Sequence, residues 1–354
     1  MRLTLTFLTL VLASFESAYA LPRAYQRPSR RSSVDVLDDV LVFDAPAFDD
    51  PANPENTLVQ LQGYVATREI SIQSLLSGIS TLLNQTLGLD ISQDLATATS
   101  RLALFGTIPL SGKTITANVN GCGNAVTLPP LTALSSTDSR NINFTMFPSS
   151  ADGFGVISDI DDTVKVSHTL DKLQLAQATL IDTPVPVTGM PDVYASLSKS
   201  LESPQFIYVS ASPFQLYPFL RDFIDTTYSA SSGPIMLNNL TTTSLSSIID
   251  FAQDNGIEAY KSAMIDRIQG MYPGKKFLTV GDSTQKDPET YGEAIRKYGD
   301  FIACAWIRKV DGANNTDERF AEAFAGVSPS KYKLYTDDEI PGLANIDVAG
   351  GSCS

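Results

Sequence analysis

Apolar positions after Gly153 occur as short continuous runs, separated by longer stretches with helical periodicity. Runs of this kind predict buried strands, which we place at Phe154–Ser158, Phe206–Ser210, Pro234–Leu237, Lys276–Val280 and Phe301–Ile307. Over Gln215–Tyr228 the apolar residues recur at helical spacing, which predicts a helix with one buried face. Alternating strands and helices favour an α/β fold with a doubly wound parallel sheet, and we assign it to residues 151–345.

Residues 37–150 follow a different pattern, rich in Thr, Ser, Leu and Val and broken by turn residues. Thr57–Val65 and Thr114–Val119 alternate between apolar and polar positions, which predicts strands. Between them, Ile72–Leu104 carries apolar residues at helical spacing. We therefore expect residues 37–150 to form a β-rich accessory domain with one or two helices.

The amino terminus has the pattern of a secretory signal peptide. Arg2 is followed by the apolar run Leu3–Phe15 and by Ala18-Tyr19-Ala20, which fits a small-x-small cleavage site after residue 20. A run of this length is too short to span a bilayer, although an uncleaved signal anchor is the alternative. No later segment is apolar enough to be a membrane span, so the mature chain is expected to have none.

Two further features agree with export. Residues 21–36 are basic and are expected to be a disordered tail, or a processed one if Arg30-Arg31 is a dibasic cleavage site. Four N-x-S/T sequons predict glycan acceptors on surface loops, at Asn84, Asn143, Asn239 and Asn314. We therefore expect a secreted glycoprotein, in the medium, the cell wall or a vacuole.

The charge and the cysteines narrow the possible partners and compartments. A formal net charge of −14 opposes binding to nucleic acid, and an anionic lipid substrate would need a local basic patch. Cys304 lies in an apolar run and is expected to be a buried thiol, which leaves Cys122–Cys353 as the predicted disulfide. None of the cysteines has the spacing of a zinc site.

Candidate chemistry begins with two carboxylates, Asp159 and Asp161, at the end of the first predicted strand. The carboxyl edge of a parallel sheet is where open α/β folds bind their ligands. Residues two apart in an extended chain point to the same side, so the two acids need a cation or a shared proton between them. One acid can then attack as a nucleophile while the other transfers protons.

Three later segments add polar groups in a definite order. Ser210 ends the second predicted strand, Lys261 lies ahead of a helical segment, and Asp282 follows the fourth strand in a G-D-x-x-x-x-D motif that ends at Asp287. This order resembles the four motifs of the haloacid-dehalogenase superfamily of phosphohydrolases. The strings GFGVISDIDDTVK, YVSASPFQLYP and KFLTVGDSTQKDPETYGE further resemble the actin-patch-protein phosphatidate phosphatase family, over about residues 151–310.

The resemblance implies a haloacid-dehalogenase-like domain with a small cap or none. It implies a phosphomonoesterase that converts phosphatidate to diacylglycerol and phosphate, in which Asp159 forms an aspartyl-phosphate and Asp161 donates and accepts the proton. Ser210 and Lys261 would bind phosphoryl oxygens. Mg²⁺ would be held by Asp159, by the backbone carbonyl of Asp161, and by Asp282 and Asp287.

Structural roles compete with some of these assignments. Asp287 precedes Pro288 and could be a helix cap, and Ser210 could satisfy a loop amide. Asp162 fits a turn, Ser212 before Pro213 fits a helix start, and Thr163 fits a role in fixing the loop backbone. The single histidine, His168, is expected to lie on a flexible loop rather than to act as a ligand, which disfavours chemistry based on histidine.

Two other functions remain open. One is a secreted phosphatase for a different phosphate ester, which the acidic net charge favours. The other is a non-catalytic lipid-binding protein on a phosphatase fold, against which the four intact motifs argue.

Overall fold

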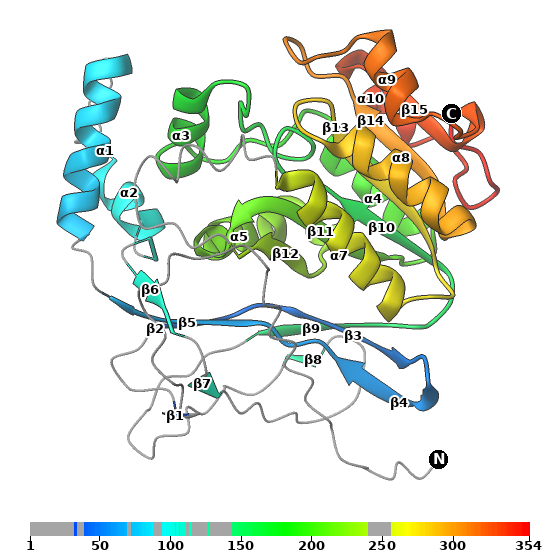
Figure 1. Ribbon diagram of the computed structural model, residues 1–354, viewed down its shortest axis with the longest axis horizontal. Helices are drawn as coiled ribbons and strands as arrows, with labels where there is room; N and C mark the ends of the chain where they lie inside the picture. Colours follow the sequence, from blue (N-terminus) through cyan, green and yellow to red (C-terminus); the bar gives the residue numbers. More distant parts are fainter. Residues whose placement is uncertain are drawn as a thin grey trace. The chain divides into compact units, whose positions relative to one another are not determined.

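A computed structural model of the chain describes residues 32–33, 39–68, 72–87, 94–102, 104–105, 107–110, 113–114, 126–127, 144–239 and 256–354. The predicted signal peptide, residues 1–20, lies outside the described residues, as do Asn143, Cys122 and all but Ser32–Ser33 of the basic segment 21–36. Figure 1 shows the ribbon with its element labels.

The chain divides into two compact units, Met1–Thr67 with Pro109–Pro148, and Arg68–Ile108 with Ser149–Ser354. The second unit therefore includes helices α1 (Ile72–Leu87) and α2 (Leu95–Leu102), which the sequence analysis grouped with residues 37–150. They belong to it because α2 packs against α3 (Lys172–Leu180). The predicted domain boundary at residue 150 therefore differs from this division of the chain.

The second unit is built on a six-stranded parallel sheet, which confirms the α/β class. Its strand order is β12-β11-β10-β13-β14-β15. The strands are β10 (Phe154–Ser158), β11 (Gln205–Pro213), β12 (Ile235–Asn238), β13 (Lys276–Asp282), β14 (Ile302–Arg308) and β15 (Tyr332–Tyr335). The first five were predicted within a few residues, and β15 was not.

The strand order has one reversal, and it lies at β10. From β10 the chain adds β11 and β12 on one side, then crosses over and adds β13, β14 and β15 on the other. A reversal of this kind opens a crevice at the carboxyl ends of the strands, which is where such sheets bind ligands. The close fit of β10 to β13 depends on Gly155, because a Cβ there would lie 2.2 Å from the Phe277 ring.

Helices follow most of the strands. They are α4 (Met190–Ser200), α5 (Tyr217–Thr227) after the 3-10 turn η2 (Phe214–Leu216), α7 (Ile257–Met271), α8 (Asp287–Tyr298), α9 (Asp317–Ala323) and α10 (Ile340–Leu343). Helices α7 and α8 lie side by side and contact β11 and β14 respectively (Figure 1). Tyr194 of α4 stacks on Phe206 and Tyr208 of β11. None of the described helices is long and apolar enough to cross a membrane.

The first unit is rich in strands, as predicted. Antiparallel pairs join β2 (Asp39–Val42) to β5 (Gly63–Arg68), β3 (Ala45–Asp50) to β4 (Asn53–Val59), and β8 (Val126–Thr127) to β9 (Thr145–Ser149). Short segments β1 (Ser32–Ser33) and β7 (Lys113–Thr114) pair in parallel, and β6 spans Thr107–Pro109. Val42, Ala45, Phe144 and Met146 form a core cluster.

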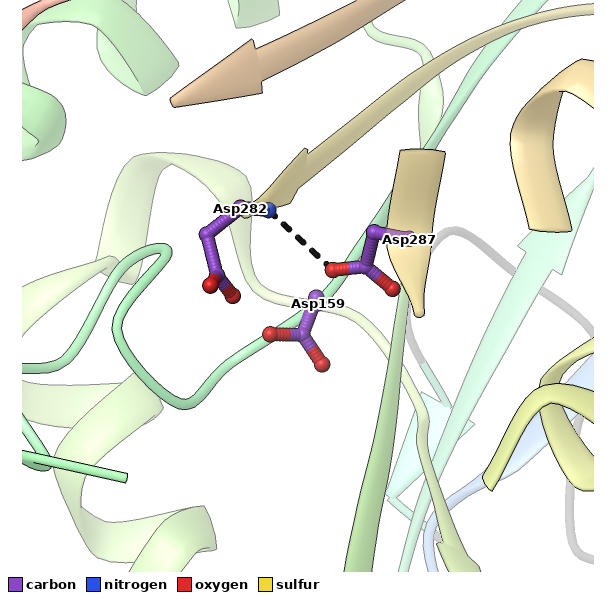
Figure 2. A group of neighbouring side chains, drawn as sticks. All are labelled: Asp159, Asp282 and Asp287. Atoms are coloured by element: carbon purple, nitrogen blue, oxygen red, sulfur yellow. Dashed lines mark hydrogen bonds between the residues drawn. The ribbon is translucent and has the colours of Figure 1, made fainter. Parts of the chain in front are cut away.

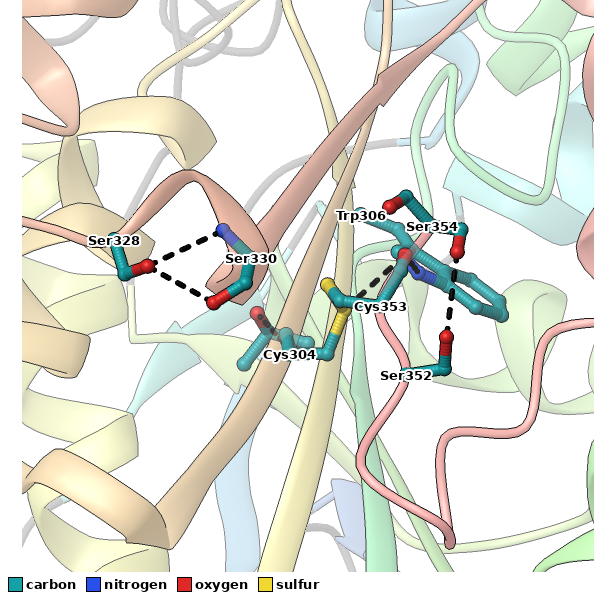
Figure 3. Close-up of a disulfide and its surroundings, with 8 residues drawn as sticks. Cys304, Trp306, Ser328, Ser330, Ser352, Cys353 and Ser354 are labelled. Atoms are coloured by element: carbon teal, nitrogen blue, oxygen red, sulfur yellow. Dashed lines mark hydrogen bonds between the residues drawn. A yellow bond between two sulfur atoms is a disulfide. The ribbon is translucent and has the colours of Figure 1, made fainter.

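The disulfide corrects the predicted cysteine pairing. Cys304 of β14 is bonded to Cys353, with a Cα–Cα distance of 5.6 Å, so it is neither a free thiol nor left out of the bridge (Figure 3). Cys122, the predicted partner, lies outside the described residues. The carboxyl-terminal segment runs along β14, where Trp306 Nε1 donates to the carbonyl oxygen of Cys353 at 3.0 Å. Burial of Cys304 was predicted, but this return of the terminus to β14 was not.

Candidate active site

Three buried carboxylates meet at the carboxyl edge of the sheet. Asp159 follows β10, Asp282 ends β13, and Asp287 begins α8 (Figure 2). Each is at most 1% exposed, and one oxygen of each lies within 4.8 Å of the others. We call Asp159, Asp282 and Asp287 the carboxylate cluster.

Strand pairing and one glycine bring these acids together. Strands β10 and β13 are parallel neighbours in which Ser158 pairs with Val280, so the residues after them meet at the same edge. The backbone N–H of Asp159 continues this pairing by donating to the Val280 carbonyl at 2.8 Å. At Gly281 a Cβ would lie 2.4 Å from an Asp287 carboxylate oxygen, so glycine makes room for that acid. Asp287 Oδ2 then accepts from the backbone N–H of Asp282 at 3.1 Å.

One cation lies within this group. Lys261 of α7 donates through Nζ to Asp159 Oδ1 at 2.8 Å and to Asp287 Oδ1. Burial favours the neutral amine of Lys261, but Asp159 and Asp287 outweigh it and raise the pKa of the ammonium group. The single ammonium therefore stays charged among three acids.

The acids of the cluster hold protons more tightly than ordinary aspartates. Burial raises the pKa of Asp159 well above its usual range, although the Lys261 ammonium opposes the rise. Burial raises the pKa of Asp282 to about 7, and the neighbouring Asp287 and Asp162 carboxylates add to it. Protons or a cation can relieve this excess of negative charge.

Thr163 bridges two acids of the cluster. Its Oγ1 lies 3.1 Å from Asp159 Oδ2 and 3.2 Å from Asp282 Oδ2, both within hydrogen-bond reach. The predicted role of Thr163 was to fix the loop backbone. The structure adds a direct contact with the carboxylates, which fixes the orientation of both.

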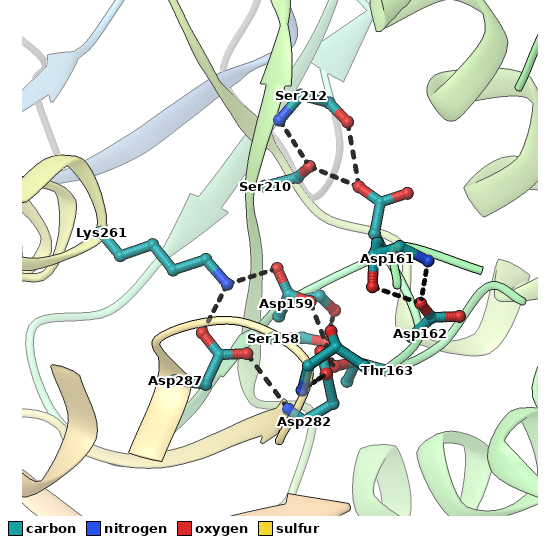
Figure 4. A network of polar contacts seen from close by, with 12 residues as sticks. Ser158, Asp159, Asp161, Asp162, Thr163, Ser210, Ser212, Lys261, Asp282 and Asp287 are labelled. Carbon is teal, nitrogen blue, oxygen red and sulfur yellow. Dashed lines mark hydrogen bonds and ion pairs between the residues drawn. The ribbon is translucent and has the colours of Figure 1, made fainter. Parts of the chain in front are cut away.

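Asp161 lies in a different environment, beside the cluster (Figure 4). Its Oδ2 accepts from Ser210 Oγ at 3.0 Å and Ser212 Oγ at 2.9 Å, and its Oδ1 accepts from Ser167 Oγ at 2.7 Å. We call Ser167, Ser210 and Ser212 the hydroxyl ring. The Lys165 ammonium, itself buried, lies 3.5 Å from Asp161 Oδ1.

This environment shifts the pKa of Asp161 in the opposite direction. Burial alone would raise it, but the Lys165 charge and the hydrogen bonds from the hydroxyl ring outweigh burial, and the pKa lies below its ordinary value. A nearby positive charge and hydrogen bonds that favour the charged form of the carboxyl account for this direction.

Asp162 shapes the loop that carries the acid pair. It has a positive φ of 56° and accepts from the backbone N–H groups of Ser167, His168 and Thr169 at 2.7–2.9 Å. These contacts agree with the predicted turn role of Asp162. His168 is exposed on the same loop, with a positive φ of 59°.

All six predicted site residues come together at this edge, although their chemical roles stay predictions. Lys261 lies within α7 rather than ahead of a helix. Asp287 makes no side-chain cap of α8, because its oxygens accept from Lys261 and from Asp282 N–H. The Asp161 side chain lies outside the carboxylate cluster, and its predicted contribution to a metal was through its backbone carbonyl.

Ser212 was not predicted to be a site residue. A serine before a proline usually begins a helix, but β11 continues through Pro213. Ser210 and Ser212 therefore alternate onto the same side of the strand and both contact Asp161. The observed length of β11 identifies Ser212, and periodicity along the sequence does not mark where this strand ends.

Comparisons with known proteins concern this region. Residues 154–309 match the family described as the catalytic domain of phosphatidate phosphatase APP1. Phosphatidate phosphatase APP1 of Saccharomyces cerevisiae is 30% identical over 159 residues, which cover 44% of this chain and 26% of that protein. An uncharacterized protein of Schizosaccharomyces pombe is 26% identical over 161 residues, 45% of this chain and 25% of that protein.

The chain thus spans only about a quarter of the length of these two relatives. The matched part contains β10 through β14 and every residue of the carboxylate cluster and the hydroxyl ring. Residues 154–309 of this chain are therefore similar to the catalytic domain of the APP1 phosphatidate phosphatases.

Proposed function

We propose that this protein is a Mg²⁺-dependent phosphatidate phosphatase that acts through an aspartyl-phosphate on a haloacid-dehalogenase-like domain. The observation that carries the proposal is the meeting of the carboxylate cluster with Lys261, next to an aspartate held by hydroxyl groups. Phosphoryl transfer needs mainly positioning and compensation of charge, and this arrangement provides both.

The carboxylate cluster fits a hard divalent cation. Mg²⁺ prefers oxygen ligands, and Asp159, Asp282 and Asp287 each offer one within 4.8 Å of the others. Three buried acids with one ammonium group also carry an excess of negative charge that a cation would offset. When bound there, Mg²⁺ would reduce the repulsion between the phosphate dianion and the attacking carboxylate.

In this mechanism Asp159 is the nucleophile, and Asp161 is the general acid and then the general base. A carboxylate oxygen of Asp159 attacks phosphorus, and the bond from phosphorus to the ester oxygen breaks. That oxygen takes a proton from Asp161 and leaves as the free alcohol. Asp161, now ionised, takes a proton from water, whose oxygen attacks the aspartyl-phosphate, releases inorganic phosphate and restores Asp159.

Lys261 and Ser210 would position the phosphoryl group. The Lys261 ammonium already contacts Asp159 Oδ1, so a phosphoryl group approaching that oxygen would meet its positive charge. The Ser210 hydroxyl would donate to a phosphoryl oxygen from the Asp161 side. Donors placed where charge develops in the transition state are among the strongest contributions to catalysis.

The proposal of phosphatidate as the substrate rests on the similarity to the yeast relative. The net charge of the chain favours a soluble phosphate ester as the alternative substrate. Phosphatidate is the substrate in the name of the yeast relative. A formal net charge of −14 instead favours a soluble phosphate ester over an anionic lipid surface. The chemistry at Asp159 and Asp161 is the same for both.

We also propose that the chain is exported and glycosylated. The Cys304–Cys353 disulfide supports an oxidising compartment, where such bridges persist. Asn84, Asn239 and Asn314 are exposed, as glycan acceptors must be, although Asn84 lies on α1 rather than on a loop. Asn143 and the predicted signal peptide lie outside the described residues. Mass spectrometry of the secreted protein would detect the cleaved terminus and the glycans.

The test is hydrolysis of short-chain phosphatidate with Mg²⁺ by the wild-type protein, Asp159→Asn and Asp161→Asn. We expect Asp159→Asn to lose activity by roughly 10⁴-fold or more, because the nucleophile is gone. Asp222→Asn is the control, since Asp222 is an exposed acid on α5. Full activity of Asp159→Asn would refute the mechanism. Fast turnover of soluble esters with none of phosphatidate would support the alternative substrate.

A further inference from the structure

Two positively charged side chains, Lys165 and Arg101, lie on either side of one aromatic side chain, Phe219. Together they form a row that begins beside Asp161 and leads toward α2. The Lys165 ammonium, which contacts Asp161, lies over the Phe219 ring of α5 at 5.7 Å from its centroid. The Arg101 guanidinium of α2 lies over the same ring at 4.3 Å. All three residues belong to the second unit, so a helix from early in the chain brings a positive charge to the vicinity of Asp161.

Toward the described residues, Arg101 uses little of its hydrogen-bonding capacity. A guanidinium has five N–H donors, and the one hydrogen bond that Arg101 makes within the described residues goes to the Thr179 carbonyl at 3.1 Å. Its charge is half-buried, and Asp182 compensates it only at longer range. A partly desolvated cation with unused donors is suited to an acceptor that arrives with a ligand.

The direction of the row matches the side on which the leaving group lies. In the proposed mechanism Asp161 gives its proton to the ester oxygen, so the leaving group is on the Asp161 side of the phosphoryl group. The carboxylate cluster and Lys261 occupy the other side. A leaving group that extends from Asp161 past Lys165 therefore meets Phe219 and then Arg101.

We propose that Arg101 and Phe219 form a leaving-group subsite. The guanidinium binds acceptor oxygens of the leaving group, and the ring contacts its carbon skeleton. Such oxygens occur as the ester carbonyls of a glycerolipid or as a second phosphate on a soluble ester. This inference rests on the proposed function, because it uses Asp161 to orient the substrate.

A purely structural role for Arg101 makes a different prediction. Thr179 lies in the last turn of α3, where a cation stabilises the free carbonyls of a helix end. If that were the whole role, Arg101→Gln would lower the melting temperature and leave substrate selectivity unchanged. Arg296→Gln is a matched control, because Arg296 also donates to carbonyls at a helix end, at Ala323 and Ala325.

The kinetic test compares wild type, Arg101→Gln and Arg296→Gln on four esters. These are dioctanoyl phosphatidate, its ether-linked analogue without carbonyls, a sugar bisphosphate and p-nitrophenyl phosphate. We expect Arg101→Gln to raise KM roughly tenfold for an ester with the recognised oxygens, with p-nitrophenyl phosphate unchanged. An effect on dioctanoyl phosphatidate alone identifies carbonyls, and an effect on the bisphosphate alone identifies a second oxyanion. Equal effects on all four esters, or none, would overturn the subsite.

A binding measurement keeps this test independent of turnover. In the Asp159→Asn background, calorimetry with dioctanoyl phosphatidate and with the sugar bisphosphate measures affinity without hydrolysis. The added Arg101→Gln change is expected to weaken binding of one of them roughly tenfold, and Arg296→Gln is expected to leave both unchanged. Unchanged affinity for both ligands would overturn the subsite even if the protein proves to be an active phosphatase. A loss of affinity in a protein without phosphatase activity would refute only the proposed function.

Discussion

Asp159 and Asp161 lie on one loop with a single residue between them, yet their surroundings are opposite. Asp159 shares its site with two further carboxylates and one ammonium group, and burial raises its pKa. Asp161 accepts hydrogen bonds from three hydroxyl groups, and its pKa lies below the ordinary value because these bonds and Lys165 outweigh burial. Environments that push two acids apart in this way are typical of sites that use them for different tasks.

In the proposed mechanism Asp161 must acquire a proton before the ester oxygen leaves. In the free protein Lys165 and the hydroxyl ring favour the ionised carboxylate, which suits the step of the proposed mechanism in which Asp161 would act as a base. A phosphate dianion bound beside it would add negative charge and raise its pKa. Proton uptake by Asp161 would therefore accompany substrate binding.

The largest expected effect that separates the two acids comes from Asp161→Asn. Loss of a general acid and base typically costs 10²–10⁴-fold, and we expect turnover of phosphatidate to fall by about that factor. With p-nitrophenyl phosphate the leaving group needs no proton, so formation of the aspartyl-phosphate should stay fast while its hydrolysis slows. Rapid-mixing measurements should then show a burst of nitrophenol close to one per protein. A slow, burst-free reaction would place Asp161 in the first step for every ester.

A smaller effect is expected in how the affinity for Mg²⁺ depends on pH. A buried carboxyl with a raised pKa stabilises the cation-free fold at low pH, and this stability is lost as pH rises toward about 7, the pKa of Asp282. Mg²⁺ needs the ionised carboxylate, so its affinity should weaken roughly tenfold per pH unit below that value.

The rise in melting temperature caused by Mg²⁺ should therefore be greater at about pH 8 than at about pH 6. Thermal unfolding with and without Mg²⁺ measures it, and Asp282→Asn, which cannot ionise, should remove most of the dependence on pH. A rise of equal size at both pH values would contradict the role of Asp282 as a ligand.

The smallest effect on activity is expected from the disulfide, which lies away from both acids. Cys353→Ala should lower the free energy of unfolding by about 2–4 kcal/mol and leave kcat/KM unchanged. Chemical denaturation measures the first quantity, and Cys122→Ala is the matched control, expected to have no effect. A loss of stability in the control would favour the pairing predicted from the sequence.

The residues of the carboxylate cluster could be predicted from the sequence because their placement follows from the order of the strands. Asp159 and Asp282 each follow a buried apolar run, and parallel strands end at one edge of a sheet. Asp287 was ambiguous because an acid before a proline also caps helices. Its oxygens accept from Lys261 and from the Asp282 N–H, so it lies in the carboxylate cluster and makes no side-chain cap of α8.

Features that depend on where a segment stops or returns could not be predicted in the same way. Ser212 belongs to the site because β11 extends past Ser210, and boundaries of strands are poorly marked by periodicity. The Cys304–Cys353 bridge depends on the carboxyl terminus returning to β14, which spacing between cysteines does not encode. The packing of α2 on α3 likewise joins segments that are far apart in the sequence.

Trapping of the phosphorylated protein tests the central claim most directly. Asp161→Asn, mixed with Mg²⁺ and p-nitrophenyl phosphate and quenched in acid, should accumulate the aspartyl-phosphate because its leaving group needs no proton and its hydrolysis lacks a base. Peptide mass spectrometry should then find a phosphoryl group on Asp159 and none in the Asp159→Asn/Asp161→Asn double variant. A phosphoryl group on another residue, or substrate turnover without any phosphorylated peptide, would contradict the account.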